Sequence, residues 1–97
     1  MFTTKQRSNL RSIAQTIESI GQVGKGGISE NQIEFFKEAI SKRELIKITV
    51  LNNSESDAKE LSTIIANSIN AEVVCVIGHK IVLYKYSDKK GVKHVEF

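Results

Sequence analysis

The chain contains no proline and one cysteine, and none of its apolar runs is long enough to cross a membrane. A single cysteine excludes an internal disulfide, and the apolar neighbours of Cys75 indicate a buried thiol in a reducing compartment. The polar first residues lack the apolar core of a secretory signal. We therefore expect a cytoplasmic protein with no membrane partner.

Residues suited to catalysis or metal binding are also scarce. His79, His94 and Cys75 are expected in a turn, a tail and a strand, and their spacing fits no metal site. Nothing in the sequence brings a nucleophile and a base together. We expect a protein that is not an enzyme and that has no metal, no cofactor and no small-molecule substrate.

The net charge of +3 is distributed unevenly along the chain. Residues 5–47 hold eight Lys or Arg against five acids, and residues 80–97 hold five lysines against two acids. The stretch between them, residues 48–79, holds one lysine against four acids. Two basic regions that flank an acidic one favour a surface with one face toward a polyanion, although evenly solvated charge is an open alternative.

Hydrophobic periodicity predicts one domain over residues 1–86 and a loose basic tail over residues 87–97. The fold class is α/β, with the order α-β-α-β-α-β-β and a four-stranded mixed sheet packed by helices. The helices are expected over residues 4–18, 29–42 and 58–69, and the strands over residues 19–23, 45–51, 72–77 and 81–86. Each strand-helix-strand unit is expected to cross over right-handed and to pair its strands in parallel. The Gly78-His79 pair predicts an antiparallel hairpin between the last two strands.

Capping residues support the predicted helix starts. Thr3 with Gln6, and Ser29 with Gln32, have the spacing of capping boxes. Ser54 with Asp57 is expected to cap the third helix.

A glycine-rich segment, Gly24-Lys25-Gly26-Gly27, separates the first predicted strand from the second predicted helix. Backbone N–H groups at a helix start bind anions, and glycine lets the backbone approach a ligand closely. The spacing fits neither a nucleoside triphosphate loop nor the dinucleotide fingerprint, because no lysine follows Gly27 and Ser29 stands where the third glycine should be. A GxxG element remains, which in some single-stranded RNA binders clamps the sugar-phosphate backbone.

Three sequence blocks occur in a specific order: residues 22–29 (QVGKGGIS), 43–48 (RELIKI) and 76–84 (VIGHKIVLY). Together they resemble the CRM domain in its stand-alone bacterial form, the YhbY family of ribosome assembly proteins, over nearly the whole chain. The resemblance implies a fold similar to the C-terminal domain of translation initiation factor three and association with precursors of the large ribosomal subunit. In plants, CRM domains occur in factors that promote group II intron splicing. Two positions depart from the family pattern: Asn70 stands where glycine is common, and Lys85 where arginine often follows the Leu-Tyr pair.

The resemblance also implies that the glycine loop contacts RNA together with nearby basic residues. The predicted RNA-binding residues are Gly24, Lys25, Gly26, Gly27, Lys5, Arg7, Arg11 and Lys47. Arg7 and Arg11 are four residues apart on one helix and therefore share a side. Lys47, together with Lys42 and Arg43, could also lie at the edge opposite the loop as ordinary solvated charge. Whether Lys42, Arg43, Lys85 and the lysine-rich tail take part is open.

We expect a monomer that grips structured ribosomal RNA by backbone and shape, with strong salt dependence and little sequence preference. The sequence offers no clear set of aromatic side chains on which bases could stack. Tyr84 is expected in the core, and Tyr86 could either stack on a base or belong to the core. The alternative is a protein–protein adaptor within ribosomal or translation complexes, docked through the acidic third helix and the hairpin. Double-stranded DNA is disfavoured because no helix carries a dense run of Arg, Lys and Asn.

Overall fold

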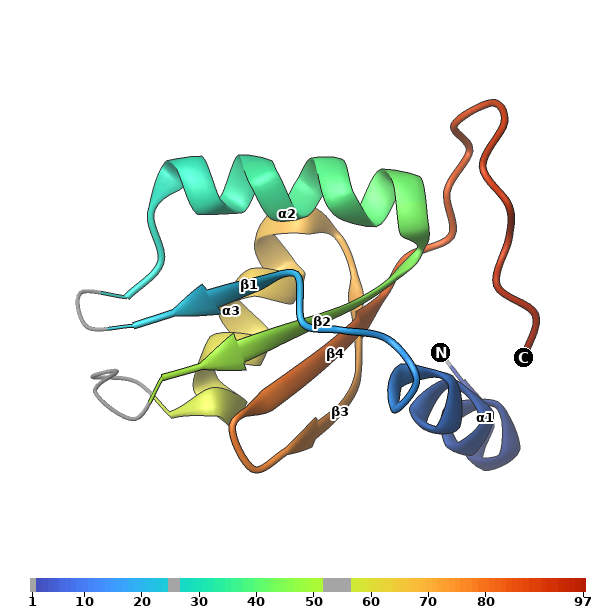
Figure 1. Cartoon of the computed structure of the whole chain (residues 1–97), viewed down its shortest axis with the longest axis horizontal. Helices are drawn as coiled ribbons and strands as arrows, with labels where there is room; N and C mark the ends of the chain where they lie inside the picture. Colours follow the sequence, from blue (N-terminus) through green and yellow to red (C-terminus); the bar gives the residue numbers. More distant parts are fainter. Residues whose placement is uncertain (1, 25–26, 52–56) are drawn as a thin grey trace.

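The computed structural model describes residues 2–24, 27–51 and 57–97. The described residues form three helices and four strands in the predicted order (Figure 1). The elements are α1 (Thr4–Ala14), β1 (Gly21–Val23), α2 (Glu30–Arg43), β2 (Leu45–Val50), α3 (Ala58–Ile69), β3 (Glu72–Ile77) and β4 (Lys80–Tyr84). The predicted α/β class, with a four-stranded mixed sheet, is confirmed.

The four strands are arranged in the order β1-β2-β4-β3. β1 and β2 are parallel, and β4 pairs antiparallel with both β2 and β3. The prediction that each strand-helix-strand unit pairs its strands directly is therefore right for β1 and β2 and wrong for β2 and β3, which β4 separates. The two-residue turn at Gly78, where φ is +57°, folds β4 back beside β3. Residues 81–84 of β4 are all buried, which suits the strand between β2 and β3.

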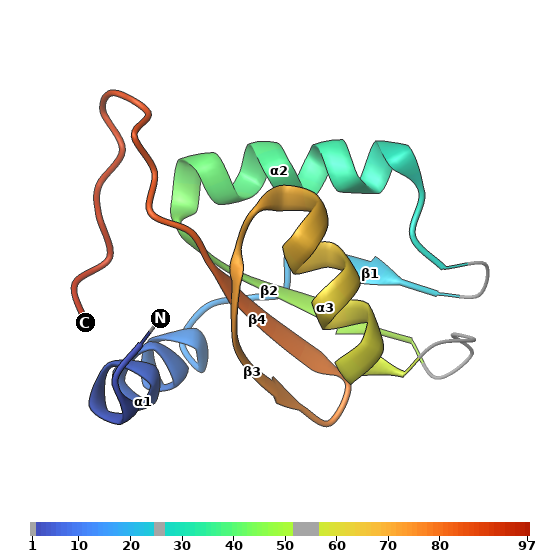
Figure 2. The same ribbon diagram turned by 180° about the vertical axis from the view of Figure 1, so that it is seen from behind.

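Two apolar clusters cover the two faces of the sheet. α2 and α3 pack on one face, where Phe36, Ile40 and Ile65 meet Ile48 and Ile81 (Figure 2). α1 packs on one end of the opposite face and leaves the other end of that face without a helix over it (Figure 1). The cluster beneath α1 consists of Leu10, Ala14, Leu45, Val74, Val82 and Tyr84.

The predicted caps determine where the helices begin. Thr3 and Gln6 form a capping box at α1, and Ser29 and Gln32 form a second at α2, as predicted. At α3 the cap is Asp57, whose carboxylate accepts a hydrogen bond from the backbone N–H of Glu60 at 2.7 Å. Ser54 lies outside the described residues.

α1 ends four residues before the predicted boundary at residue 18. The backbone N–H of Thr16 bonds to the carbonyl of Ile13 at 2.9 Å, three residues back, and the hydroxyl of Thr16 donates to the same carbonyl at 2.7 Å. These tighter bonds end the α-helix, and they are a common form of helix terminus.

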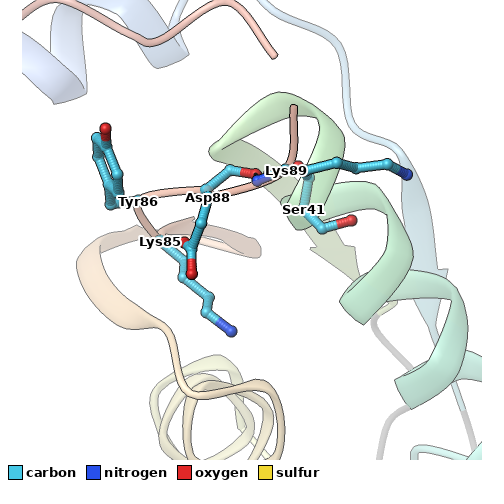
Figure 3. Close-up of a pocket in the computed structure, with 6 residues that line it drawn as sticks. Ser41, Lys85, Tyr86, Asp88 and Lys89 are labelled. Carbon is cyan, nitrogen blue, oxygen red and sulfur yellow. Dashed lines mark hydrogen bonds between the residues drawn. The ribbon is translucent and has the colours of Figure 1, made fainter. Parts of the chain in front are cut away.

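After β4 the chain passes the carboxyl end of α2, beside a hollow of about 400 Å³. Lys85 and Tyr86 line this hollow together with Ser41, Asp88 and Lys89 (Figure 3). Ser87 is buried here, and its hydroxyl donates to the carbonyl of Ser41.

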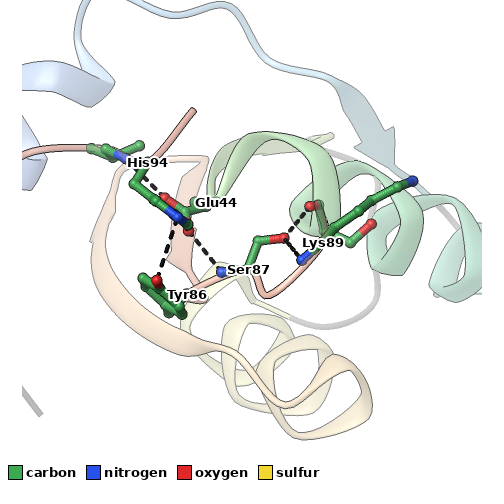
Figure 4. Close-up of polar contacts among 7 residues, drawn as sticks. Glu44, Tyr86, Ser87, Lys89 and His94 are labelled. Atoms are coloured by element: carbon green, nitrogen blue, oxygen red, sulfur yellow. Dashed lines mark hydrogen bonds and ion pairs between the residues drawn. The ribbon is translucent and has the colours of Figure 1, made fainter. Parts of the chain in front are cut away.

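The last eleven residues, 87–97, are held against the domain by the buried carboxylate of Glu44 (Figure 4). Its oxygens accept hydrogen bonds from the backbone N–H groups of Ser87 at 2.7 Å and Val95 at 2.8 Å. The Nδ1 atom of His94 lies 2.7 Å from the same carboxylate, and Phe97 packs beneath α1. The prediction of a loose tail is wrong, because Glu44 supplies acceptors that sequence periodicity does not reveal. The boundary between a domain at 1–86 and a separate tail stays a prediction.

The Glu44 carboxylate stays charged despite its burial. Burial raises its pKa, but the hydrogen bonds from Ser87, His94 and Val95 together outweigh this effect and leave the pKa below its usual value. Glu44 also has a positive φ of 65°, which is uncommon for a residue with a side chain. The contact between the Glu44 carboxylate and His94 gives Glu44 a structural role at the carboxyl end of α2.

Candidate functional site

The glycine loop begins directly after β1 and leads to the cap of α2, as predicted. Its described ends are joined by a hydrogen bond from the backbone N–H of Gly27 to the carbonyl of Gly24, at 3.2 Å. Gly27 has a φ of +77°, a conformation that favours glycine, and a Cβ at this position would meet no atom within 4 Å. The backbone of the loop is therefore approachable from outside at Gly27. The predictions for Lys25 and Gly26 lie outside the described residues.

The base of the loop is fixed on both sides. The side-chain amide of Gln32 in α2 donates to the carbonyl of Gln22 in β1 at 2.8 Å. The backbone N–H of Leu51 donates to the carbonyl of Val23 at 2.8 Å. A rigid base of this kind lowers the conformational entropy that a loop loses when it binds a ligand.

Some of the backbone N–H groups at the amino end of α2 already have hydrogen-bond partners. Its capping box occupies the backbone N–H groups of Ser29 and Gln32, and Glu30 places a carboxylate in the first turn. The helix end is therefore less suited to an anion than its position suggests, and anion binding would depend more on the loop itself.

The predicted basic residues of α1 do not lie beside the loop. α1 and the start of α2 are at opposite ends of the molecule in both views (Figures 1 and 2). Lys5 is exposed on α1, whereas Arg7 is half-buried and donates from one nitrogen to the carbonyls of Val73 and Val74. Those carbonyls belong to an irregular stretch of the edge strand β3. Arg7 therefore ties α1 to the sheet.

Arg11 and Lys47 come together on the half of the sheet that α1 leaves open. They line a shallow hollow of about 260 Å³ with a third cation, Lys80. We call Arg11, Lys47 and Lys80 the open-face cluster. Lys80 was absent from the predicted site, although the alternation of β4 could have placed it on the same face as Val82 and Tyr84.

The two tyrosines differ in burial. Tyr84 is in the core, as predicted, at 9% exposure, and Tyr86 is 61% exposed. The ring of Tyr86 stacks on His94 with a centroid distance of 4.6 Å and an interplanar angle of 10°. One face of the Tyr86 ring is therefore occupied by the chain itself.

The described residues contain no group of three or more His, Cys, Asp or Glu side chains placed to hold a metal ion. Among the described helices, none has the length and apolar character needed to cross a membrane. The Cys75 thiol is half-buried, where burial raises its pKa and the charges of Arg11, Arg7 and Lys47 act in the opposite direction.

The fold and the loop can be compared with known proteins. A family model described as the CRS1 / YhbY (CRM) domain matches residues 2–85. The chain belongs to the CRM domain family. The predicted resemblance is therefore confirmed, and the glycine loop, the cap of α2 and the open-face cluster all lie within the matched CRM domain.

Curated relatives of the chain occur in bacteria and archaea. A Bacillus subtilis (strain 168) protein named "Probable RNA-binding protein YqeI" is 44% identical over 96 residues, which are 99% of this chain and 98% of that protein. A Haemophilus influenzae protein named "RNA-binding protein" is 26% identical over 92 residues, covering 95% of this chain and 93% of that protein. A Methanocaldococcus jannaschii protein, also named for RNA binding, is 35% identical and covers 98% of this chain and 77% of that protein.

A solved structure shares the fold of this CRM domain. It is the solution structure of a Staphylococcus aureus protein described as a candidate RNA-binding protein, with 44% sequence identity and a TM-score of 0.78. The alignment covers 93% of this chain and 94% of the Staphylococcus chain.

Proposed function

We propose that this CRM domain binds structured RNA in precursors of the large ribosomal subunit, as a cytoplasmic monomer without catalytic activity. The observation that carries the proposal is the glycine loop, which starts from a fixed base between β1 and α2 and has open space where a Cβ of Gly27 would lie. Backbone N–H groups on such a loop can approach phosphodiester oxygens closely. The names of the relatives, which describe RNA binding, support the same ligand class.

The basic residues contribute in different ways in this proposal. The loop supplies the close backbone contacts, with Lys25 adding a charge, and Arg11 and Lys47 add charge from the open face. Lys5 is exposed and can contact a long RNA at the far end of the molecule. For Arg7 we propose a supporting role, because its guanidinium already holds α1 against β3.

Crosslinking in cells tests the proposed ligand. Ultraviolet crosslinking followed by sequencing of the bound RNA is expected to enrich large-subunit ribosomal RNA, and the signal is expected in fractions that sediment with subunit precursors. Purified protein is expected to bind the same RNA with an affinity that falls steeply between 50 and 200 mM salt, because phosphate contacts release counterions. Enrichment of unrelated RNA would contradict the ribosomal part of the proposal. Absence of any salt-dependent RNA affinity would instead favour the adaptor.

A further inference from the structure

The open face of the sheet brings cations together from three different elements. Arg11 comes from the last turn of α1, Lys47 from β2 and Lys80 from the start of β4. Lys47 is directly opposite Val82 in the register, and Lys80 is two residues before Val82 on the same strand. Lys47 and Lys80 are therefore diagonal neighbours on one face, a relation that places two residues roughly 7–8 Å apart.

Among the described residues, no carboxylate forms an ion pair with this cluster. In the part of the chain that the structure describes, ion pairs form at Lys42, Lys89 and His94 and not at the three cluster residues. The described side chains that line the hollow include no carboxylate; besides the cluster they are Ala14, Gln15, Ile77 and Val82. The carboxyl end of α1 adds only about half a negative charge nearby, against three full positive charges.

The larger hollow beside Tyr86 does not have these properties. Its lining includes the carboxylate of Asp88, and Lys89 is already paired with Glu38 at 3.6 Å. Lys85 and Tyr86 also extend in different directions from the chain (Figure 3). The open-face cluster is therefore better suited to an anion than the larger hollow.

A row of polar residues crosses the sheet from Lys80 of the cluster to β1, the strand that precedes the glycine loop. Lys80 donates to the hydroxyl of Thr49 at 2.8 Å, and that hydroxyl donates to the hydroxyl of Ser19 at 2.8 Å. In the sheet register Thr49 is also opposite Gln22, which is two residues before Gly24. Adjacent strands are about 4.8 Å apart, so Gln22 and Lys80 are separated by only about 10 Å across the sheet.

We propose that the open-face cluster is a second RNA contact, separate from the glycine loop, in which Arg11, Lys47 and Lys80 bind phosphate groups of the RNA backbone. The guanidinium of Arg11 can bind one phosphate through two nitrogens, and the two lysines act as point charges. The apolar floor at Ile77 and Val82 can contact ribose. One RNA segment then runs from the loop across the row Gln22, Thr49 and Lys80 to α1. This inference rests on the proposed RNA-binding function and adds Lys80 to its site.

The test compares two triple variants with the same change in charge. R11Q/K47Q/K80Q removes the cluster, and K37Q/K59Q/K93Q removes three exposed lysines from α2, α3 and the C-terminal segment. Affinity for a large-subunit ribosomal RNA transcript is measured from 50 to 200 mM salt. The cluster variant is expected to bind about tenfold more weakly and to lower the slope of log K against log salt by roughly 2, since each phosphate contact on a single strand contributes about 0.7. The control is expected to change the slope by less than about 0.5.

A single substitution tests the same contact with less risk that the variant misfolds. Lys80 is exposed, so K80Q is expected to leave the melting temperature unchanged and to lower the slope by about 0.7. If K80Q and the cluster triple match the control, the second contact does not exist. If wild-type protein shows no salt-dependent affinity for the transcript, the proposed function itself fails. The two results are distinct, because the first requires that wild-type protein binds.

Discussion

An aspartate at Gly27 is expected to lower RNA affinity about tenfold, which corresponds to about 1.4 kcal/mol. The substitution places a negative charge where the loop would meet phosphate, and the new Cβ also keeps the backbone from approaching as closely. A Cβ at Gly27 has no neighbour within 4 Å, so the folded domain has room for it. The loss is measured by fluorescence anisotropy with a large-subunit ribosomal RNA transcript.

Gly91 provides a matched control for this prediction. It has a φ of +88°, a Cβ there would also meet nothing within 4 Å, and Gly91→Asp changes the net charge equally. We expect the Gly91 variant to bind RNA within twofold of the wild type. Two other loop variants, Lys25→Ala and Gly26→Asp, should weaken binding in the same direction as Gly27→Asp. Equal affinities for the Gly27 and Gly91 variants would remove the loop from the RNA site.

Replacing Glu44 with glutamine is expected to destabilise the domain by about 3 kcal/mol. The buried carboxylate accepts three hydrogen bonds, and an amide has one oxygen to offer and a nitrogen that would face the same donors. Removing one partner from a buried charged network typically costs about 3–5 kcal/mol. For a domain of this size the melting temperature should fall by roughly 12–24 °C, measured by circular dichroism.

Glu38 is the control for the Glu44 prediction. Its carboxylate is exposed and pairs with Lys42 and Lys89 at the surface, so Glu38→Gln should leave the melting temperature nearly unchanged. If the Glu44 and Glu38 variants have the same melting temperature, the anchoring of residues 87–97 does not depend on the Glu44 carboxylate.

The effect of pH on stability follows from the same carboxylate. The pKa of Glu44 is lower in the folded protein than in the unfolded chain, where a glutamate side chain has a pKa of about 4.3. Its contribution is therefore fully present above the unfolded pKa and is lost as the pH falls through the folded pKa. The stability difference between the wild type and Glu44→Gln should be constant near neutral pH and should shrink in acid. A difference that grows in acid would contradict this account.

Local sequence signals predicted most of the elements of the fold. The capping boxes at Thr3 and Ser29 fixed two helix starts to the residue, because a cap is satisfied by side chains only three positions away. The stripe of α3, which includes Leu61 and Ile65, is buried as its spacing predicts. The alternation of β2 likewise separates buried Ile46 from the partly exposed Lys47.

Features that depend on distant residues were not predictable in this way. β4 lies between β2 and β3 in the sheet. The order of strands in a sheet depends on contacts between distant segments, and no local sequence pattern specifies it. The fixed path of residues 87–97 depends on Glu44, at least 43 positions away in sequence. In the same way, Arg11 and Lys80 belong to different predicted elements and meet only through the sheet.

The most direct test of the central claim is the footprint of RNA on the protein. Backbone amide signals of ¹⁵N-labelled protein are recorded during titration with a large-subunit ribosomal RNA transcript fragment. We expect the largest shifts at Gly24, Gly27 and the open-face residues Lys47 and Lys80, with little change along α3. Shifts confined to α3 and the hairpin turn, or no shifts at all, would contradict RNA binding through the glycine loop.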